Sequence, residues 1–155
     1  MNITQEEWYV INTIISKIYK SKAASILLEV CKELKLLIPY DKAFTNLASN
    51  SNNIIQYFHY ESLNIADEYI ESYKNHYVDI DYCAWYTAQP KASVYRDTQL
   101  IYEEKRLKSV FYTEWLAPIG MHYACGVSLA SNETAYGDIT LFRSKENGDF
   151  SDKEL

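Results

Sequence analysis

Glycine and proline are scarce in this chain. Four of its 155 residues are glycine and three are proline. Together they make up less than about 5% of the sequence, whereas average proteins contain about 12%. Long irregular loops, and the glycine-rich loops that cradle phosphate groups, are therefore mostly excluded.

Cysteines, positive charges and long apolar runs are also limited. Cys31, Cys83 and Cys125 are odd in number and have no C-x-x-C spacing, which favours free thiols in a cytoplasmic protein. The net charge of −6 opposes direct binding of DNA or of an anionic membrane. No apolar run approaches the roughly 20 residues of a transmembrane helix, and the early acids Glu6 and Glu7 are unlike a signal peptide.

The apolar content that is present suffices for one folded domain over residues 1–155. Leucine, isoleucine, valine and phenylalanine account for 39 residues. Tyrosine contributes 15 of the 23 aromatic residues. Because its ring is apolar while its hydroxyl seeks a hydrogen-bond partner, this excess suits an amphipathic small molecule or a hydrated interface. Ordinary core and surface tyrosines are the alternative.

Capping signals and helical periodicity predict the helices. Thr4 and Glu7 form a capping-box pattern, and apolar residues then recur at helical spacing as far as Lys20. Further helices are expected over residues 21–37, 65–89 and 102–116, the second of them interrupted at residues 79–81. Residues 150–155 repeat the capping pattern, so another helix is expected to begin at Ser151.

Alternating patterns predict the strands, over residues 42–49, 54–61, 92–96, 121–131 and 136–144. The polar segment 49–53 reads as a hairpin turn, and the last two strands read as a second hairpin. The order α-α-β-β-α-β-α-β-β predicts an α+β fold in which helices pack on an antiparallel sheet.

Familiar catalytic and metal-binding motifs are missing. The sequence contains no G-x-S-x-G, H-E-x-x-H or P-loop pattern, and its histidines and cysteines lack metal-ligand spacing, so neither a metal nor a cofactor is expected. Aromatic residues instead gather around one acid, Asp81. If that segment covers a sheet face, the rings line a cavity in which Asp81 accepts a hydrogen bond from a ligand. An ordinary aromatic core is the alternative. The cluster comprises Tyr73, Tyr77, Asp81, Tyr82, Trp85, Tyr86 and Tyr95.

The C-terminal third carries the most specific pattern. Residues 111–123 read FYTEWLAPIGMHY and residues 140–152 read TLFRSKENGDFSD. With Tyr95-Arg96-Asp97, these segments resemble GAF-like sensor domains that precede LuxR-type helix-turn-helix regions in bacterial transcription regulators. The resemblance runs from about Ser25 to Leu155. It implies a GAF/PAS-like sandwich with a central five-stranded antiparallel sheet and helices on both faces, one face bearing the terminal helices and the other a ligand pocket.

The resemblance also implies a function. The domain is expected to be non-catalytic, to bind a small amphipathic ligand and to form a homodimer through its terminal helices. The closing helix and the DNA-binding module of the regulator are expected to be absent from residues 1–155. A dimerisation module with a pocket filled by its own aromatics, or a small soluble enzyme, are the alternatives. The candidate ligand-binding residues are Tyr57, Tyr73, Tyr77, Asp81, Trp85, Tyr95, Trp115, Tyr123 and Cys125.

A narrower comparison is with acyl-homoserine-lactone receptors, whose pocket pattern is an aromatic-x3-Tyr, then Asp-Pro, then Trp. Tyr73-x3-Tyr77 and Asp81 follow this pattern. Tyr82 stands where the pattern has proline, and Tyr95 stands where it has tryptophan. The sequence therefore leaves the identity of the ligand open.

Overall fold

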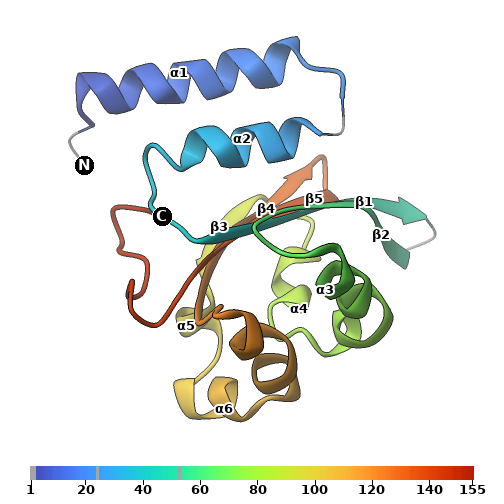
Figure 1. Ribbon diagram of the computed structural model, residues 1–155. Coiled ribbons are helices and arrows are strands. Elements are labelled where there is room, and N and C mark those ends of the chain that lie inside the picture. Colours follow the sequence, from blue (N-terminus) through green and yellow to red (C-terminus); the bar gives the residue numbers. More distant parts are fainter. Residues whose placement is uncertain (1–2, 24, 52–53) are drawn as a thin grey trace.

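A five-stranded antiparallel sheet forms the centre of the computed structural model, which describes residues 3–23, 25–51 and 54–155 (Figure 1). The strand order is β2-β1-β5-β4-β3, which confirms the predicted α+β class and both predicted hairpins. Of the predicted turn at residues 49–53, positions 49–51 belong to β1, and residues 52 and 53 lie outside the described residues. The strands are β1 (Lys42–Ser51), β2 (Ile54–Leu63), β3 (Ser93–Arg96), β4 (Tyr123–Ser131) and β5 (Thr134–Arg143).

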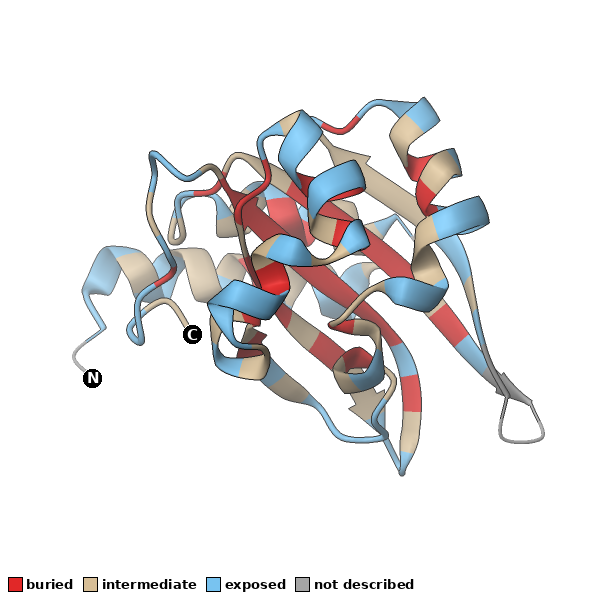
Figure 2. Ribbon diagram, turned by 90° about the horizontal axis from the view of Figure 1, so that it is seen from below, coloured by how far each residue is buried: buried red, intermediate tan, exposed pale blue. Residues whose placement is uncertain are grey.

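Helices cover both faces of the sheet, as predicted. α1 (Gln5–Lys20) and α2 (Ile26–Leu34) lie on one face, with α1 outermost (Figure 1). The opposite face is covered by short helical pieces, and Figure 2 shows buried residues along the strands beneath exposed outer helix surfaces. These pieces are α3 (Asp67–Ser72), η1 (Tyr73–Tyr77), η2 (Val78–Ile80), α4 (Ala84–Thr87), α5 (Asp97–Leu100), α6 (Glu103–Lys108), η3 (Phe111–Leu116) and η4 (Ala117–Ile119).

The predicted capping box starts α1. The Thr4 side chain accepts a hydrogen bond from the Glu7 backbone N–H at 3.1 Å, and the Glu7 carboxylate accepts one from the Thr4 N–H at 2.7 Å. Both contacts satisfy N–H groups that have no partner within the helix. This local signal placed the beginning of α1 correctly.

Three predicted helices are shorter or more broken than their periodicity indicates. The second begins at Ile26, not Ser21, because the Ser21 hydroxyl accepts a hydrogen bond from the Ala23 N–H and holds a turn. The predicted helix over residues 102–116 breaks at Ser109, whose backbone is extended and whose hydroxyl accepts a hydrogen bond from the Tyr112 N–H. The expected helix start at Ser151 is a turn closed by Glu154, whose N–H donates to the Ser151 carbonyl.

A buried ion pair attaches the helices around α6 to the sheet. Arg106 and Asp97 are both fully buried, with Arg106 Nη1 lying 3.3 Å from Asp97 Oδ2. The other Asp97 oxygen accepts a hydrogen bond from the Ala124 N–H of β4 at 3.1 Å, and Arg106 donates to the His122 carbonyl. The pair therefore joins α5 and α6 to the beginning of β4.

Removing one partner of this pair is expected to be costly. In Asp97→Ala, Arg106 would stay buried without its counter-charge, so the free energy of unfolding should fall by about 3–5 kcal/mol. Glu104→Ala breaks an exposed pair with Lys108 and should change it by less than about 1 kcal/mol. Urea denaturation of the three proteins measures both effects. Equally small losses in the two variants would contradict the structural role of Asp97.

Candidate functional site

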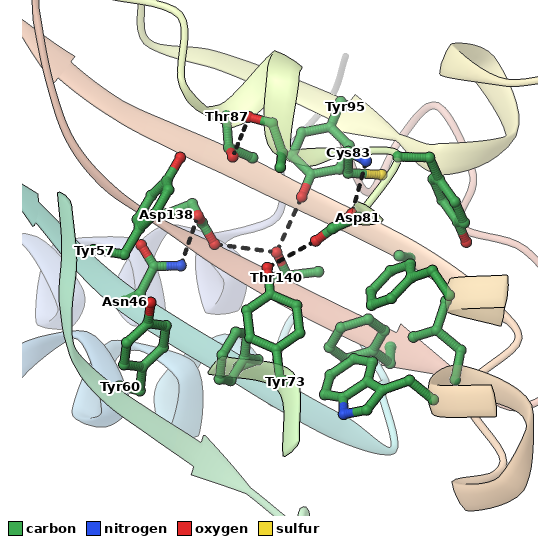
Figure 3. A pocket seen from close by; sticks show the side chains of 18 residues that line it. Asn46, Tyr57, Tyr60, Tyr73, Asp81, Cys83, Thr87, Tyr95, Asp138 and Thr140 are labelled. Carbon is green, nitrogen blue, oxygen red and sulfur yellow. Dashed lines mark hydrogen bonds between the residues drawn. The ribbon is translucent and has the colours of Figure 1, made fainter. Parts of the chain in front are cut away.

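A small cavity lies between the sheet and the helices of the α3–α6 face (Figure 3). Its volume is about 30 Å³, room for roughly two water molecules. Half of its lining residues are aromatic, and its polar groups come from strands β1, β2, β3 and β5, from η1 and from the segment around α4. The lining residues are Phe44, Asn46, Tyr57, Tyr60, Tyr73, Asp81, Tyr82, Cys83, Ala84, Thr87, Tyr95, Phe111, Trp115, Leu116, Ala124, Asp138, Thr140 and Phe142.

Strand alternation decides which side chains reach the cavity. On β5, Asp138, Thr140 and Phe142 face it, whereas Ile139 and Leu141 pack in the core beneath α1 and α2. On β4, the inward positions hold small residues, so that a large ring has space above them. A Cβ atom at Gly126 would lie 2.7 Å from the Tyr95 hydroxyl. Glycine at this position therefore allows the Tyr95 ring to lie over β4.

A β-bulge brings two tyrosines of β2 to the same face. Tyr57 and Tyr60 are three residues apart, so regular alternation would send them to opposite faces. Between Thr45 and Leu47 of β1 the register with β2 shifts by one residue, and His59 adopts a left-handed backbone with φ of 52°. The extra residue allows both Tyr57 and Tyr60 to line the cavity.

Asp81 ends one helical run and begins a turn that carries its carboxylate into the cavity. The carboxylate accepts hydrogen bonds from the Cys83 N–H at 2.7 Å and from the Tyr73 hydroxyl at 2.9 Å. The predicted interruption of this helix is confirmed, with Asp81 as its polar cause. Burial raises the pKa of Asp81 to about 6, although these hydrogen bonds oppose the rise.

Asp138 supplies a second acid, which is buried, from the middle of the sheet. Its carboxylate accepts hydrogen bonds from Asn46 Nδ2 at 2.8 Å and from the Thr140 hydroxyl at 3.3 Å. The Thr140 hydroxyl also lies 3.0 Å from the Tyr95 hydroxyl, which extends the network across the cavity (Figure 3). Burial, with a smaller contribution from the nearby Asp81 charge, raises the pKa of Asp138 to about 7, although its hydrogen bonds with Asn46 and Thr140 oppose the rise.

Two polar atoms of the cavity wall are left without hydrogen-bond partners. The Asn46 side-chain oxygen and the Tyr57 hydroxyl are buried and have none of good geometry, although Thr87 lies close to Tyr57. An unmet buried polar atom costs about 1–3 kcal/mol, so these atoms are available to a bound molecule.

The structure brings five of the nine predicted site residues together on the cavity wall. Asp81 and Tyr73 are joined by their hydrogen bond, and the Tyr73 and Trp115 rings lie 5.0 Å apart between centroids. The five are Tyr57, Tyr73, Asp81, Tyr95 and Trp115.

The other four predicted positions do not line the cavity. Tyr123 and Cys125 alternate to the opposite face of β4 and join the core beneath α1 and α2. Trp85 is 56% exposed, because Ala84 and Thr87 occupy the inward side of the one-turn helix α4. Tyr77 lies near the surface, with its hydroxyl 3.4 Å from the Glu114 carboxylate.

Sequence reasoning missed the polar residues of the central strands. Asn46, Asp138 and Thr140 lie on β1 and β5, among positions expected to be apolar. Asp138, a charged residue within a strand of alternating apolar residues, was the available signal. Acids are almost never fully buried without a partner, so its presence there indicated a polar site.

Other kinds of chemistry find little support in the part of the chain that the structure describes. No three His, Cys, Asp or Glu side chains there converge as metal ligands. Cys83 lies in the cavity wall, where burial raises the pKa of its thiol well above the usual range and no histidine lies beside it among the lining residues. None of the described helices combines the length and apolar character required to cross a bilayer.

The buried acid Asp138 should make stability depend on pH. Because its pKa is raised from 3.8 to about 7 on folding, the stability it contributes is present below about pH 4 and is lost as the pH rises through 7. Asparagine has no such proton to lose. The stability of Asp138→Asn relative to the wild type should therefore rise between about pH 4 and pH 7, by up to about 1.4 kcal/mol per pH unit, and level off above that range. Urea unfolding across this range tests the prediction, and a pH-independent difference would contradict it.

No protein-family model matches the sequence, and no curated protein matches it. Several solved structures share its fold. CepR2 from Burkholderia cenocepacia, described as an N-acylhomoserine-lactone-dependent LuxR-family transcription factor, aligns with 97% of this chain and 85% of its own, with a TM-score of 0.65 and 16% identity.

Two further structures agree. The VqsR LBD domain from Pseudomonas aeruginosa aligns with 90% of this chain and 81% of its own, with a TM-score of 0.64 and 8% identity. SdiA in complex with octanoyl-rac-glycerol aligns with all of this chain, which spans 62% of that protein, with a TM-score of 0.63 and 15% identity. The chain therefore has the fold of domains found in LuxR-type transcription regulators, as its sequence resemblance predicted.

Proposed function

We propose that the chain is the small-molecule-sensing domain of a bacterial LuxR-type transcription regulator and has no catalytic role. One observation carries the proposal: the buried Asp138, the half-buried Asp81 and two unpaired polar atoms converge on an aromatic cavity. The fold supports it, because the structural neighbour SdiA was solved with octanoyl-rac-glycerol bound and CepR2 is described as dependent on a lactone. Aromatic walls with a few convergent polar groups are typical of small-molecule sites.

Ligand binding would require the cavity to enlarge. Small-molecule sites commonly measure about 300–1,000 Å³, whereas this cavity measures about 30 Å³. The segment from η2 to α4 is built from helical pieces of three and four residues and forms one wall. A ligand that binds only an opened arrangement would shift the population toward it and so signal its presence.

The same small volume favours a second candidate function. If the aromatic side chains fill the pocket permanently, the domain serves only for dimerisation. A search for stabilising ligands separates the two, since a filled core gains nothing from any added molecule.

We assign DNA binding to another module of the regulator and place the protein in the cytoplasm. The net charge of −6 opposes contact between this domain and DNA. The three cysteines are unpaired and buried, which suits a reducing compartment.

We also propose that α1 forms a homodimer contact. α1 packs on α2 with one side, and Ile14 is buried there. Its outer side presents large apolar residues at helical spacing, a surface that a second copy would cover symmetrically. The exposed residues are Trp8, Tyr9, Ile15, Ile18 and Tyr19.

The sensing proposal is tested by a thermal-shift screen of metabolites and bacterial extracts. A ligand present at 100 times its Kd should stabilise the domain by about 2.7 kcal/mol, a rise of about 5–11 °C in Tm. Asp81→Asn should weaken binding of that ligand while keeping the fold, because the asparagine oxygen still accepts the Cys83 N–H.

Asp79→Asn is the matched control, because Asp79 is exposed and the charge change is identical. It should leave ligand binding unchanged. Failure of every extract and metabolite to stabilise the wild-type protein would favour the filled-pocket function.

The dimer proposal is tested with two matched tyrosines. Tyr19 of α1 is 87% exposed, and Tyr102, which precedes α6 on the other side of the sheet, is 81% exposed. Tyr19→Glu should move the protein toward monomer in sedimentation-velocity experiments, because like charges would meet across a symmetric contact. Tyr102→Glu should leave the oligomeric state unchanged. A monomeric wild-type chain, or equal effects of the two substitutions, would refute an α1 dimer.

A further inference from the structure

The charged side chains that line the cavity are all acidic. Asp81 and Asp138 both line it, and the lining residues include no lysine, arginine or histidine among the residues that the structure describes. Asp138 is only 5% exposed. Burying an acid without a positive partner is costly, and a neighbouring acid adds repulsion. The cavity therefore favours a molecule that brings positive charge.

The hydrogen-bonding groups of the wall that remain open are mostly acceptors. Asn46 is 4% exposed, and its amide nitrogen donates to Asp138, which leaves its oxygen directed elsewhere and without a partner. Two carboxylates and this oxygen all accept hydrogen bonds, and the unpaired Tyr57 hydroxyl can accept or donate one. Their complement is a group with several N–H donors. An anionic group would be repelled by the two carboxylates.

The aromatic walls suit the same ligand. Rings of Tyr57, Tyr60, Tyr73 and Tyr95 surround the acids (Figure 3), and Trp115 also lines the cavity. Aromatic faces attract cations and also accommodate a hydrocarbon chain. One molecule that combines an ammonium group with a short apolar part would satisfy both kinds of wall.

We propose, on the basis of the sensing function above, that the cavity recognises an organic cation: a protonated amine or amidine attached to a small apolar group. Its N–H groups donate to Asp138, to Asp81 and to the free Asn46 oxygen, and its hydrocarbon part packs against the aromatic rings. Neutral lactones and carboxylate ligands are disfavoured, since neither brings charge to offset the two acids.

A matched set of three probes tests this inference. n-Butylamine, n-butanol and butyrate have four carbons each and differ in charge, and binding is followed by amide NMR titration of the whole chain at constant ionic strength. Butylamine should bind the wild type with a Kd about tenfold or more below that of butanol, and butyrate should not bind. Equal binding of butanol or butyrate, or no binding of butylamine, would overturn the proposal.

Substitution of the acid adds a second test. Asp138→Asn should raise the Kd of butylamine about tenfold or more and leave that of butanol nearly unchanged, while Asp79→Asn should alter neither. Equal losses for both probes would mean that the substitution damaged the fold, not the charge recognition, and would count against the inference.

The pH dependence of the wild type provides a test that needs no variant. Affinity for butylamine should rise between about pH 5 and pH 8, as the acids with pKa values of about 6 and about 7 ionise, whereas affinity for butanol should not. A flat profile for butylamine would contradict the inference. Burial also raises the pKa of Asp97, which accepts a hydrogen bond from the Tyr82 hydroxyl, to about 6, although the charge of its partner Arg106 opposes the rise. The other titratable groups of the wall stay protonated there, because burial raises their pKa values; they are Tyr57, Tyr60, Tyr73, Tyr82, Cys83 and Tyr95.

Failure of this inference is distinguishable from failure of the sensing function. If butylamine does not bind but a neutral metabolite stabilises the wild type in the thermal-shift screen, the domain is a sensor for another ligand class. If neither binds, both proposals fail together.

Discussion

The buried Asp97–Arg106 pair holds the cavity-bearing half of the molecule together. The elements on this face are short helical pieces, each too brief to be stable alone. Asp97 accepts hydrogen bonds from the Ala124 N–H of β4, from Arg106 and, at 3.4 Å, from the Tyr82 hydroxyl. Ala124 and Tyr82 both line the cavity. One carboxylate therefore fixes two of its walls relative to each other, and the geometry of the site depends on this pair.

Strand β5 links the two faces of the sheet. Phe142 faces the cavity, while its neighbour Arg143 lies on the other side, donates to the Pro39 carbonyl and stacks over the Phe150 ring at 4.1 Å. Arg143 also pairs with Glu154. The final residues of the chain are thus held by the same strand that carries the cavity acid Asp138. A shift of β5 would therefore displace residues on both faces of the sheet: those that line the cavity and those that hold the C-terminal segment.

The features that depend on contacts between residues close in sequence were predictable from the sequence. Those that depend on pairing between distant strands were not. The Thr4 capping box and the turn at Asp81 involve residues two or three apart, so the sequence contains the whole interaction. The phase of β4 was not predictable, because both faces of the sheet are buried, and the small residues of β4, not its large apolar ones, turn out to face the cavity. Cys125 was placed on the wrong face for this reason. The bulge at His59, which turns Tyr57 and Tyr60 the same way, depends on pairing with β1 and has no sequence signal of its own.

The two acids favour the proposed binding site over a packed core. A core needs only volume and apolar contact, and an apolar residue at position 138 would provide both without the cost of burying a carboxyl group. The chain instead keeps Asp138 in its central strand, gives it Asn46 as a partner and leaves the Asn46 oxygen unsatisfied. Natural proteins depart from good packing chiefly at functional sites. The free-energy cost of burying Asp138 and of leaving the Asn46 oxygen unpaired is therefore better explained by a molecule that binds in the cavity than by a pocket that the tyrosine side chains fill.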